Sequence, residues 1–292
     1  MNSSSKVSVM ITTLNRVDDL AKTLEFLRSL NPQPFEVLVT ADGCVDGTVE
    51  MVREKFPEVR LIINEQSIGS VSSRHRMMQE AKGDLVLALD DDSHPEQADC
   101  IARLAGFFEN NPKLAIATFP QRTDEYPETL ERRDFGQQMP VRSFANSGAC
   151  LRVSTYRSLP GFEPMFFHMY EEPDYALQCV AAGWEVRYIP EITIRHHWVG
   201  RERSEIRNHH RHARNEFWST LMRCPMPYAL LLCAYRAFSQ ARFAVKRGPS
   251  WVVREPIWWC QAMKGLPKAL AKRKPVAWSG YRRWLALSDK GF

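Results

Sequence analysis

Three consecutive carboxylates, Asp90, Asp91 and Asp92, follow an apolar run of the sequence. Like charges about 4 Å apart repel by roughly 1 kcal/mol in water and by about 4 kcal/mol at a partly buried site, so they need a compensating partner. Ser93 and Glu96 have the spacing of a helix capping box, which would explain the serine at this position. The dipole of that helix would stabilise the negative charge of Asp92. Asp90 and Asp91 remain, and either a divalent cation with phosphate ligands or a solvated turn would accommodate them.

Acidic residues at two other places could also do chemistry. Asp42 ends a second apolar run and precedes a glycine, as in an ordinary turn or as a carboxylate that accepts the ring N–H of uracil or thymine. Glu171, Glu172 and Asp174 open a predicted helix, where acids interact favourably with the helix dipole. The functional alternative for this group is a general base that removes the proton of an acceptor hydroxyl.

Histidines occur as the pair His196-His197 and as the cluster His209, His210 and His212. A strand places adjacent side chains on opposite faces, so at most one residue of the pair can face a given site. The cluster lies among arginines, which favours a solvated or phosphate-facing basic helix over a metal cage.

Strands and helices alternate in the first part of the chain, which predicts a parallel sheet with right-handed crossovers. The predicted strands cover 6–13, 35–40, 59–64, 84–90 and 113–119, and the helices between the first four cover 16–30, 48–56 and 70–83. Asn15 with Asp18 resembles a cap for the first helix, and Gly83 closes the third. Because ligands bind beyond the carboxyl ends of such strands, Thr12, Asp42 and the three consecutive aspartates are selected as site residues. Residues 120–145 have little periodicity, and a helix ending at Gly183 precedes two short strands over 185–190 and 192–197.

The composition is that of an α/β protein with an appendage. The chain has 292 residues, of which 44% are hydrophobic. Seven cysteines include no C-x-x-C pair, which argues against a disulfide framework or a thiolate zinc site and favours a reducing compartment. We see no signal-peptide pattern at the N-terminus and no run of 18 apolar residues, so neither secretion nor a membrane span is predicted.

The charge is unevenly distributed along the chain. Residues 1–200 carry 20 Lys and Arg against 29 Asp and Glu, whereas residues 201–292 carry 19 against 5. Five of the eight tryptophans lie between positions 251 and 284. Basic amphipathic segments with aromatic residues over 226–292 favour an anionic membrane surface, and the alternative is a helical pair packed on the catalytic part. No nucleic-acid-binding motif accompanies the positive charge, so a nucleic-acid partner is not expected.

Five segments in order are similar to motifs of the family-2 nucleotide-sugar glycosyltransferases with the GT-A fold. They are "VSVMITTLNR", "VLVTADGCVDGT", "GSVSSRHRMMQEAKGDLVLALDDDSHP", "NSGACLRVSTYRSLPGF" and "EEPDYALQCVAAGWEVRYIPEITIRHH". The resemblance implies a GT-A-like, Rossmann-like α/β domain over 1–200, with a nucleotide-sugar half over about 1–118 and an acceptor half over about 119–200. A basic, tryptophan-rich helical extension over 201–292 follows.

The resemblance also implies roles for individual residues. Thr12, Asp42 and Arg74 match nucleotide-binding positions. We also expect Asp90 and Asp91 to bind the nucleotide. Asp90 and Asp92 match the ends of the D-x-D motif, whose acids hold Mg²⁺ or Mn²⁺, with His196 as a further ligand. Glu172 matches the catalytic acid, with Glu171 and Asp174 on the acceptor side. Three positions depart from the family pattern, namely Ala41, His75 and a glutamate in place of aspartate at 172.

The expected function is that of a metal-dependent inverting glycosyltransferase, a hexosyl- or deoxyhexosyltransferase. It would move a sugar from a nucleoside-diphosphate donor, with UDP or dTDP favoured, to a hydroxyl of a glycan or lipid-linked acceptor in surface polysaccharide assembly. The expected location is the cytoplasm, peripheral at the inner face of the cell membrane where the tail binds lipid. The alternatives are a nucleotidyltransferase, for which the glycine-rich phosphate loop is missing, and a non-catalytic sugar-binding or scaffold protein.

Overall fold

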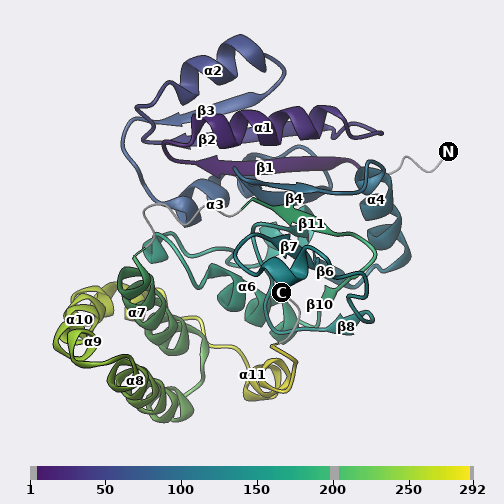
Figure 1. Ribbon diagram of the computed structural model, residues 1–292. Helices are drawn as coiled ribbons and strands as arrows, with labels where there is room; N and C mark the ends of the chain where they lie inside the picture. Colours follow the sequence, from purple (N-terminus) through teal and green to yellow (C-terminus); the bar gives the residue numbers. More distant parts are fainter. Residues whose placement is uncertain (1–4, 198–203, 290–292) are drawn as a thin grey trace.

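The computed structural model describes residues 5–197 and 204–289, with an α/β part followed by a group of helices (Figure 1). An eight-stranded sheet with the order β3-β2-β1-β4-β9-β6-β10-β8 forms the centre. Strands β3, β2, β1 and β4 are parallel, whereas β9 and β8 run antiparallel to their neighbours. The strands are β1 (Val7–Thr13), β2 (Glu36–Asp42), β3 (Arg60–Asn64), β4 (Leu85–Asp90), β6 (Leu114–Thr118), β8 (Met139–Pro140), β9 (Ala149–Arg152) and β10 (Glu185–Tyr188).

Helices pack on both faces of this sheet, which confirms the predicted fold class. On β1, Val9 and Ile11 face one hydrophobic core and Met10 faces the other, as the alternation of a strand requires. Helices α1 (Val17–Arg28), α2 (Thr48–Lys55) and α4 (Cys100–Asn110) cover the first face. Helices α3 (Ser70–Glu80), α5 (Val153–Ser158) and α6 (Glu171–Ala181) cover the second. Single-turn helices η1 (Pro127–Thr129) and η2 (Pro164–Phe166) lie in the connections.

A second, three-stranded sheet brings distant segments to the end of β4. It consists of β5 (Ser93–Pro95), β11 (Ile194–His196) and β7 (Gln121–Thr123), in the order β5-β11-β7. In the antiparallel β5–β11 ladder His196 lies opposite Ser93. This pairing places His196 close to the carboxylates at the end of β4.

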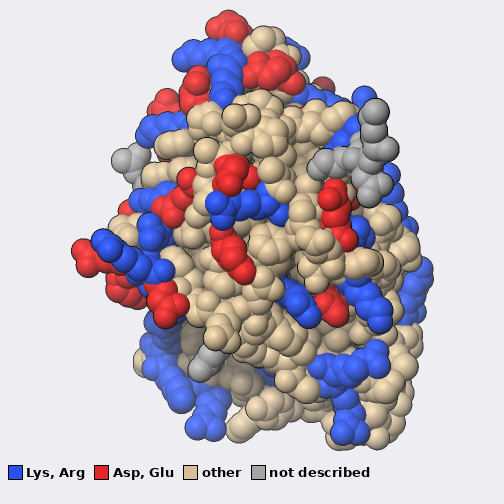
Figure 2. Space-filling view, turned by 90° about the vertical axis from the view of Figure 1, so that its right-hand side faces the viewer, with Lys and Arg blue, Asp and Glu red and all other residues tan. Residues whose placement is uncertain are grey.

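The helices after residue 204 pack on the α/β part. They are α7 (Glu205–Arg223), α8 (Tyr228–Arg247), α9 (Pro249–Arg254), α10 (Pro256–Ala271) and α11 (Trp278–Leu285). Trp218, Met222, Tyr281 and Trp284 share one core with α6 and with the sheet. Figure 2 shows Lys and Arg gathered at the lower end of one face, the end at which Figure 1 places α8 and α11. In the described part of the chain, no helix combines the length and apolarity needed to cross a bilayer.

Three local predictions were wrong. Ser93 does not cap a helix, because its hydroxyl accepts a hydrogen bond from Asp90 N (2.9 Å) and residues 93–95 form a strand. Asn15 accepts a hydrogen bond from Val45 N and does not cap α1. Helix α3 ends before Ala81, and Gly83 instead permits a close approach, since a Cβ there would lie 2.5 Å from Ser8 Oγ. The predicted end of α6 at Gly183 is confirmed by its positive φ of 89°.

Candidate functional site

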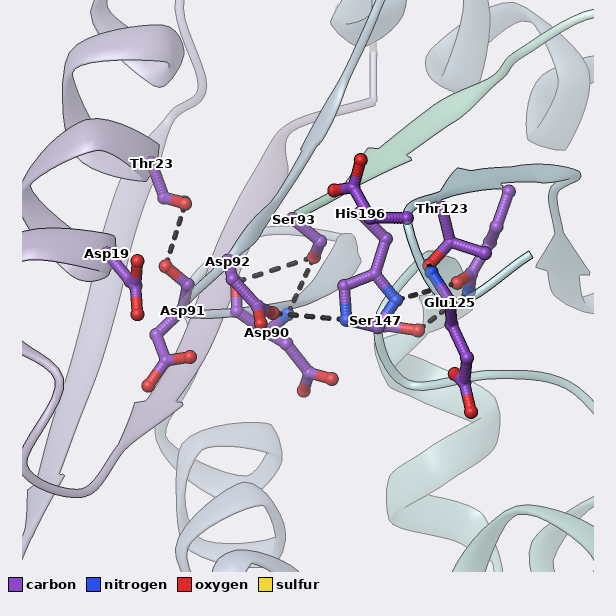
Figure 3. Close-up of polar contacts among 12 residues, drawn as sticks. Asp19, Thr23, Asp90, Asp91, Asp92, Ser93, Thr123, Glu125, Ser147 and His196 are labelled. Carbon is purple, nitrogen blue, oxygen red and sulfur yellow. Dashed lines mark hydrogen bonds and ion pairs between the residues drawn. The ribbon is translucent and has the colours of Figure 1, made fainter. Parts of the chain in front are cut away.

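The three aspartates at the end of β4 point in different directions. The hydrogen bond from Asp90 N to Ser93 Oγ closes a tight turn, so the three side chains diverge (Figure 3). The Asp91 and Asp92 side chains are only 6% and 1% exposed, whereas Asp90 is 28% exposed. Thr12 lies beside Asp90 in the β1–β4 register, half-buried at the end of β1.

Asp91 faces the β1–α1 connection. Its carboxylate accepts a hydrogen bond from Thr13 Oγ1 (2.8 Å) and forms an ion pair with Arg16 (3.0 Å). Thr23 donates to its backbone carbonyl. Burial raises the pKa of Asp91 to about 7 despite the nearby guanidinium. Each of the two carboxylate oxygens of Asp91 is thus engaged by a protein group. Neither oxygen is free in this conformation for the predicted contact with the nucleotide.

Asp92 lies between Arg16 and His196. Its two oxygens are 2.7 Å from Arg16 Nη2 and 3.1 Å from His196 Nε2. Burial alone would raise the pKa of Asp92, but the histidine and the guanidinium outweigh it and lower the pKa below its ordinary value. Arg16 was not predicted as a site residue. The only indication in the sequence is that it follows the first strand, after "TTLN".

Asp90, Asp92 and His196 can supply ligands for one cation. One ligand atom from each lies within 4.8 Å of the others, in the only such group found among the described residues. His196 Nδ1 lies 3.1 Å from Gln121 Oε1, which favours a proton on Nδ1 and directs Nε2 toward Asp92. Ligands about 2.1 Å from an octahedral ion lie roughly 3 Å apart when adjacent, which agrees with the 3.1 Å between His196 and Asp92. Carboxylates with one imidazole suit a divalent cation such as Mn²⁺ or Mg²⁺.

Asp42 holds the loop that follows β3 in place. Its carboxylate accepts hydrogen bonds from Asn64 Nδ2 (2.8 Å), Ser67 Oγ (2.7 Å), Ile68 N (3.0 Å) and Gly69 N (3.0 Å). Burial would raise the pKa of Asp42, but these donors lower it below its ordinary value. The predicted direct contact with the ring N–H of a base is therefore not offered by this conformation, because both oxygens are already hydrogen-bonded.

Arg74 connects the acidic edge, by which we mean Asp90, Asp91 and Asp92 at the end of β4, to the start of α6. This buried arginine donates to Asp90 Oδ1 (2.5 Å) and to Glu171 Oε1 (3.1 Å). Burial alone would lower its pKa, but the Asp90 and Glu171 carboxylates raise it. Asn146 Nδ2 also donates to Glu171 Oε1 (3.1 Å). Asn146 was not predicted as a site residue, although it belongs to the motif "NSGAC".

Glu172 faces a cavity of about 660 Å³, which Asp90, Glu171 and Asn146 also line. Side chains of the later helices complete the wall, namely Arg207, Arg211, His212, Arg236 and Trp284. Among the described residues, no side chain donates a hydrogen bond to the half-buried Glu172 carboxylate. Burial and the neighbouring Glu171 raise the pKa of Glu172 to about 8. A carboxylate of this kind can take a proton from a molecule bound in the cavity.

Asp174 does not line the cavity, so this structure gives its predicted acceptor-side role no support. It is 1% exposed and forms an ion pair with the buried Arg223 on α7 (3.1 Å). Ser219 Oγ (2.7 Å) and Gln178 Nε2 (2.8 Å) also donate to it. On a helix, a residue two positions after Glu172 points about 200° away from it, which directs Asp174 toward α7.

Comparisons with known proteins agree with this geometry. Residues 8–179 match the sequence profile described as glycosyl transferase family 2. The chain is 25% identical over 201 residues to the uncharacterized glycosyltransferase YwdF of Bacillus subtilis, a match that covers 65% of this chain and 73% of that protein. Two further relatives, the uncharacterized glycosyltransferase YibD of Escherichia coli and an uncharacterized glycosyltransferase of Haemophilus influenzae, are matched over 32% and 40% of their own length.

Two solved structures have a similar fold. The S. aureus TarS fragment 1–349 in complex with UDP-GlcNAc has a TM-score of 0.62 and 15% identity, covering 91% of this chain and 81% of that one. The mannosyltransferase PcManGT from Pyrobaculum calidifontis, in complex with GDP-Man and Mn²⁺, has a TM-score of 0.59 and 16% identity, covering 97% and 86%. Both likenesses support the GT-A-like arrangement of sheet and helices.

Proposed function

The chain belongs to glycosyl transferase family 2, and from this premise we propose that it transfers a sugar from a nucleoside-diphosphate donor to a hydroxyl of a glycan or lipid-linked acceptor. The proposal includes inversion at the anomeric carbon. Family membership favours sugar transfer over the nucleotidyltransferase alternative. Surface polysaccharide assembly is the role we propose for the product.

One observation carries the proposal. Arg74 donates to Asp90 and to Glu171, so a single buried side chain connects the acidic edge with the residue next to Glu172. The donor diphosphate would lie at the acidic edge and the acceptor in the cavity that Glu172 lines. This connection fixes the two reacting partners relative to each other, as bond formation between them requires.

Glu172 is the base in the proposed reaction. Its carboxylate takes the proton of the acceptor hydroxyl while the hydroxyl oxygen forms a bond to the anomeric carbon. The bond from that carbon to the diphosphate oxygen breaks on the opposite face, and the nucleoside diphosphate leaves. No described side chain donates to Glu172, so its carboxylate would be available to a hydroxyl bound in the cavity that it lines.

Asp90, Asp92 and His196 would hold Mn²⁺ or Mg²⁺. When bound, the cation supplies positive charge that stabilises the leaving diphosphate. Arg16 forms ion pairs with Asp91 and Asp92 (3.0 and 2.7 Å), and neither of these carboxylates lines the cavity of Glu172. The support for Mn²⁺ in particular is the imidazole in the set and the Mn²⁺ in the PcManGT complex.

A UDP- or dTDP-sugar is the donor we propose to test first. TarS was solved with UDP-GlcNAc and PcManGT with GDP-Man, so the shared fold accommodates either base in those proteins. In this chain Asp42 would act on the nucleotide indirectly, through the loop 65–69 that it holds. Thr12, at the end of β1, would contact the nucleotide directly.

The last helices support a peripheral membrane location. Among the described residues, 14 of the 22 exposed large hydrophobic side chains lie between Met226 and Leu270. Exposed cations such as Arg242 and Lys268 lie on the same helices. An apolar face rimmed by cations suits the interface of an anionic bilayer.

The catalytic proposal is tested with a panel of UDP-, dTDP- and GDP-sugars, assayed for binding and for slow hydrolysis with Mn²⁺, Mg²⁺ or EDTA. We expect metal-dependent hydrolysis of one donor, its loss in Glu172→Gln, and retention of donor binding in that variant. Binding without turnover by the wild type would instead support the non-catalytic alternative. Wild-type turnover in Asp92→Ala, or in excess EDTA, would contradict the metal assignment.

The membrane proposal is tested by sedimentation with liposomes of phosphatidylcholine alone or with phosphatidylserine, at low salt. Leu231 and Phe238 are each 66% exposed on α8, and changing both to glutamate should reduce binding to the anionic liposomes. Val45→Glu, at an 87% exposed position outside these helices, is the matched control. If the wild type ignores anionic liposomes, the proposed location is wrong.

A further inference from the structure

Two arginines of α7 stand out in the wall of the acceptor cavity. Arg207 and Arg211 are one helical turn apart, and both line the cavity that Glu172 faces. Like charges at this spacing are unfavourable on a helix. Among residues 5–197 and 204–289, no Asp or Glu forms an ion pair with Arg211, whose guanidinium lies over the Phe167 ring at 5.3 Å.

Three arginines that line the same cavity have acidic partners, namely Arg74, Arg142 and Arg236. Arg74 is bonded to Asp90 and Glu171. Arg236 pairs with Glu216 (2.9 Å), and Arg142 pairs with Asp289. The contrast sets Arg211 apart, because its positive charge is not balanced by a carboxylate of the described chain.

Burial makes this charge more costly. The pKa of Arg211 is lowered by burial and by the neighbouring Arg207, since both disfavour its charged form. His168, whose Nδ1 is 2.8 Å from Ser70 Oγ, lines the same cavity as Glu171. An anion bound at α7 would offset the repulsion between the two guanidinium groups.

The position separates these arginines from the proposed metal ligands. Asp92 and His196 do not line the cavity, and Asp90 is the one member of that group which does. The donor diphosphate would therefore approach from the Asp90 edge, while the α7 arginines lie with Glu172 on the acceptor side. Arg207 and Arg211 also line a second cavity of about 450 Å³, together with the apolar side chains of Phe167, Ile206 and Ile257.

We propose that Arg207 and Arg211 form an anion subsite that recognises a phosphate or carboxylate group of the acceptor. This inference rests on the proposed function, and it deepens that function by naming the chemical class of the acceptor. Guanidinium groups bind planar oxyanions through paired, charge-assisted hydrogen bonds. An acceptor of this class places its anionic group on α7 and its hydroxyl near Glu172.

The test measures binding of glucose 1-phosphate, glucuronate and glucose to the full chain by ligand-observed NMR, in EDTA. Without a divalent cation the acidic edge repels anions, so phosphate has to bind elsewhere. Loss of a charge-assisted hydrogen bond corresponds to about tenfold or more in affinity. We expect wild type to bind at least one charged sugar about tenfold more tightly than glucose, and Arg211→Gln to abolish this difference. The phosphate and carboxylate arms identify which anion is preferred.

Arg242→Gln, at an exposed position on α8 outside the cavity, is the matched control and should retain the preference. Equal binding of all three sugars by the wild type, or equal losses in both variants, would overturn the inference. A matching loss of nucleoside-diphosphate affinity in Arg211→Gln would do the same, because the arginine would then serve the donor. Donor hydrolysis without acceptor separates the failures: its absence in wild type contradicts the proposed function, whereas hydrolysis without anion preference contradicts this inference alone.

Discussion

Removal of the Asp174 carboxylate should destabilise the protein strongly. It should remove no side chain that lines the cavity of Glu172. Asp174 accepts hydrogen bonds from Arg223 Nε and Nη2, both at 3.1 Å, from Ser219 and from Gln178. The Arg223 and Asp174 side chains are 3% and 0% exposed. The pair therefore joins α6, which carries Glu172, to α7, which carries the arginines of the acceptor cavity.

The expected cost follows from what remains after the substitution. In Asp174→Ala the Arg223 guanidinium stays buried without its counter-charge, which costs about 3–5 kcal/mol. That is a large part of the roughly 5–15 kcal/mol that stabilises a typical domain. Ser219→Ala removes one hydrogen bond to the same carboxylate and should cost about 1.5–3 kcal/mol.

Urea unfolding followed by tryptophan fluorescence measures these costs as shifts of the midpoint at unchanged slope. Asp99→Ala is the matched control, because its ion pair with Arg103 is on the surface (44% and 54% exposed for Arg103 and Asp99) and should contribute less than about 1 kcal/mol. An unmoved midpoint in Asp174→Ala, combined with a raised acceptor KM, would refute the structural role and restore the acceptor-side prediction.

Three further predictions concern the chemistry. Because burial raises the pKa of Glu172 to about 8 and only its ionised form accepts a proton, kcat/KM should rise with pH through an apparent pKa near 8; a flat profile between pH 6 and 9 would contradict this. His196→Ala should raise the Kd for Mn²⁺ by roughly tenfold or more, measured by EPR of free Mn²⁺, and an unchanged Kd would remove the histidine from the ligand set. Arg74→Met leaves the buried Glu171 without its counter-charge and should cost about 3–5 kcal/mol in urea unfolding, whereas Arg76→Met, at an exposed position on the same helix, should cost less than about 1 kcal/mol.

The sheet could be predicted from the sequence because its strands are encoded locally. Nearly every residue of β1 and β4 is buried, and both strands are mostly apolar in sequence. Helix α1 between them shows the period of an amphipathic helix. The same local reasoning failed at Ser93. Its hydroxyl could cap a helix or close a turn. Residues 93–95 pair with β11, about 100 positions away in sequence, and in this strand the hydroxyl closes the turn.

The partners of the site residues could not be predicted, because they come from distant parts of the chain. Nothing near Asp42 in sequence indicates that the backbone of residues 68 and 69 takes both its oxygens. Arg16 reaches Asp92 across 76 positions of sequence. Spacing indicates which residues are available at the ends of the strands, but the hydrogen bonds that occupy them are a property of the folded chain.

The choice between Glu171 and Glu172 illustrates why the partners matter more than the motif. Adjacent residues on a helix point about 100° apart, so the two carboxylates meet different partners although both line the cavity. Arg74 and Asn146 both donate to Glu171, which holds that carboxylate against the protein. No described side chain donates to Glu172, and burial together with the neighbouring Glu171 raises the pKa of Glu172. The arginine that bonds Glu171 also bonds Asp90, so the end of β4 and the start of α6 share one buried partner.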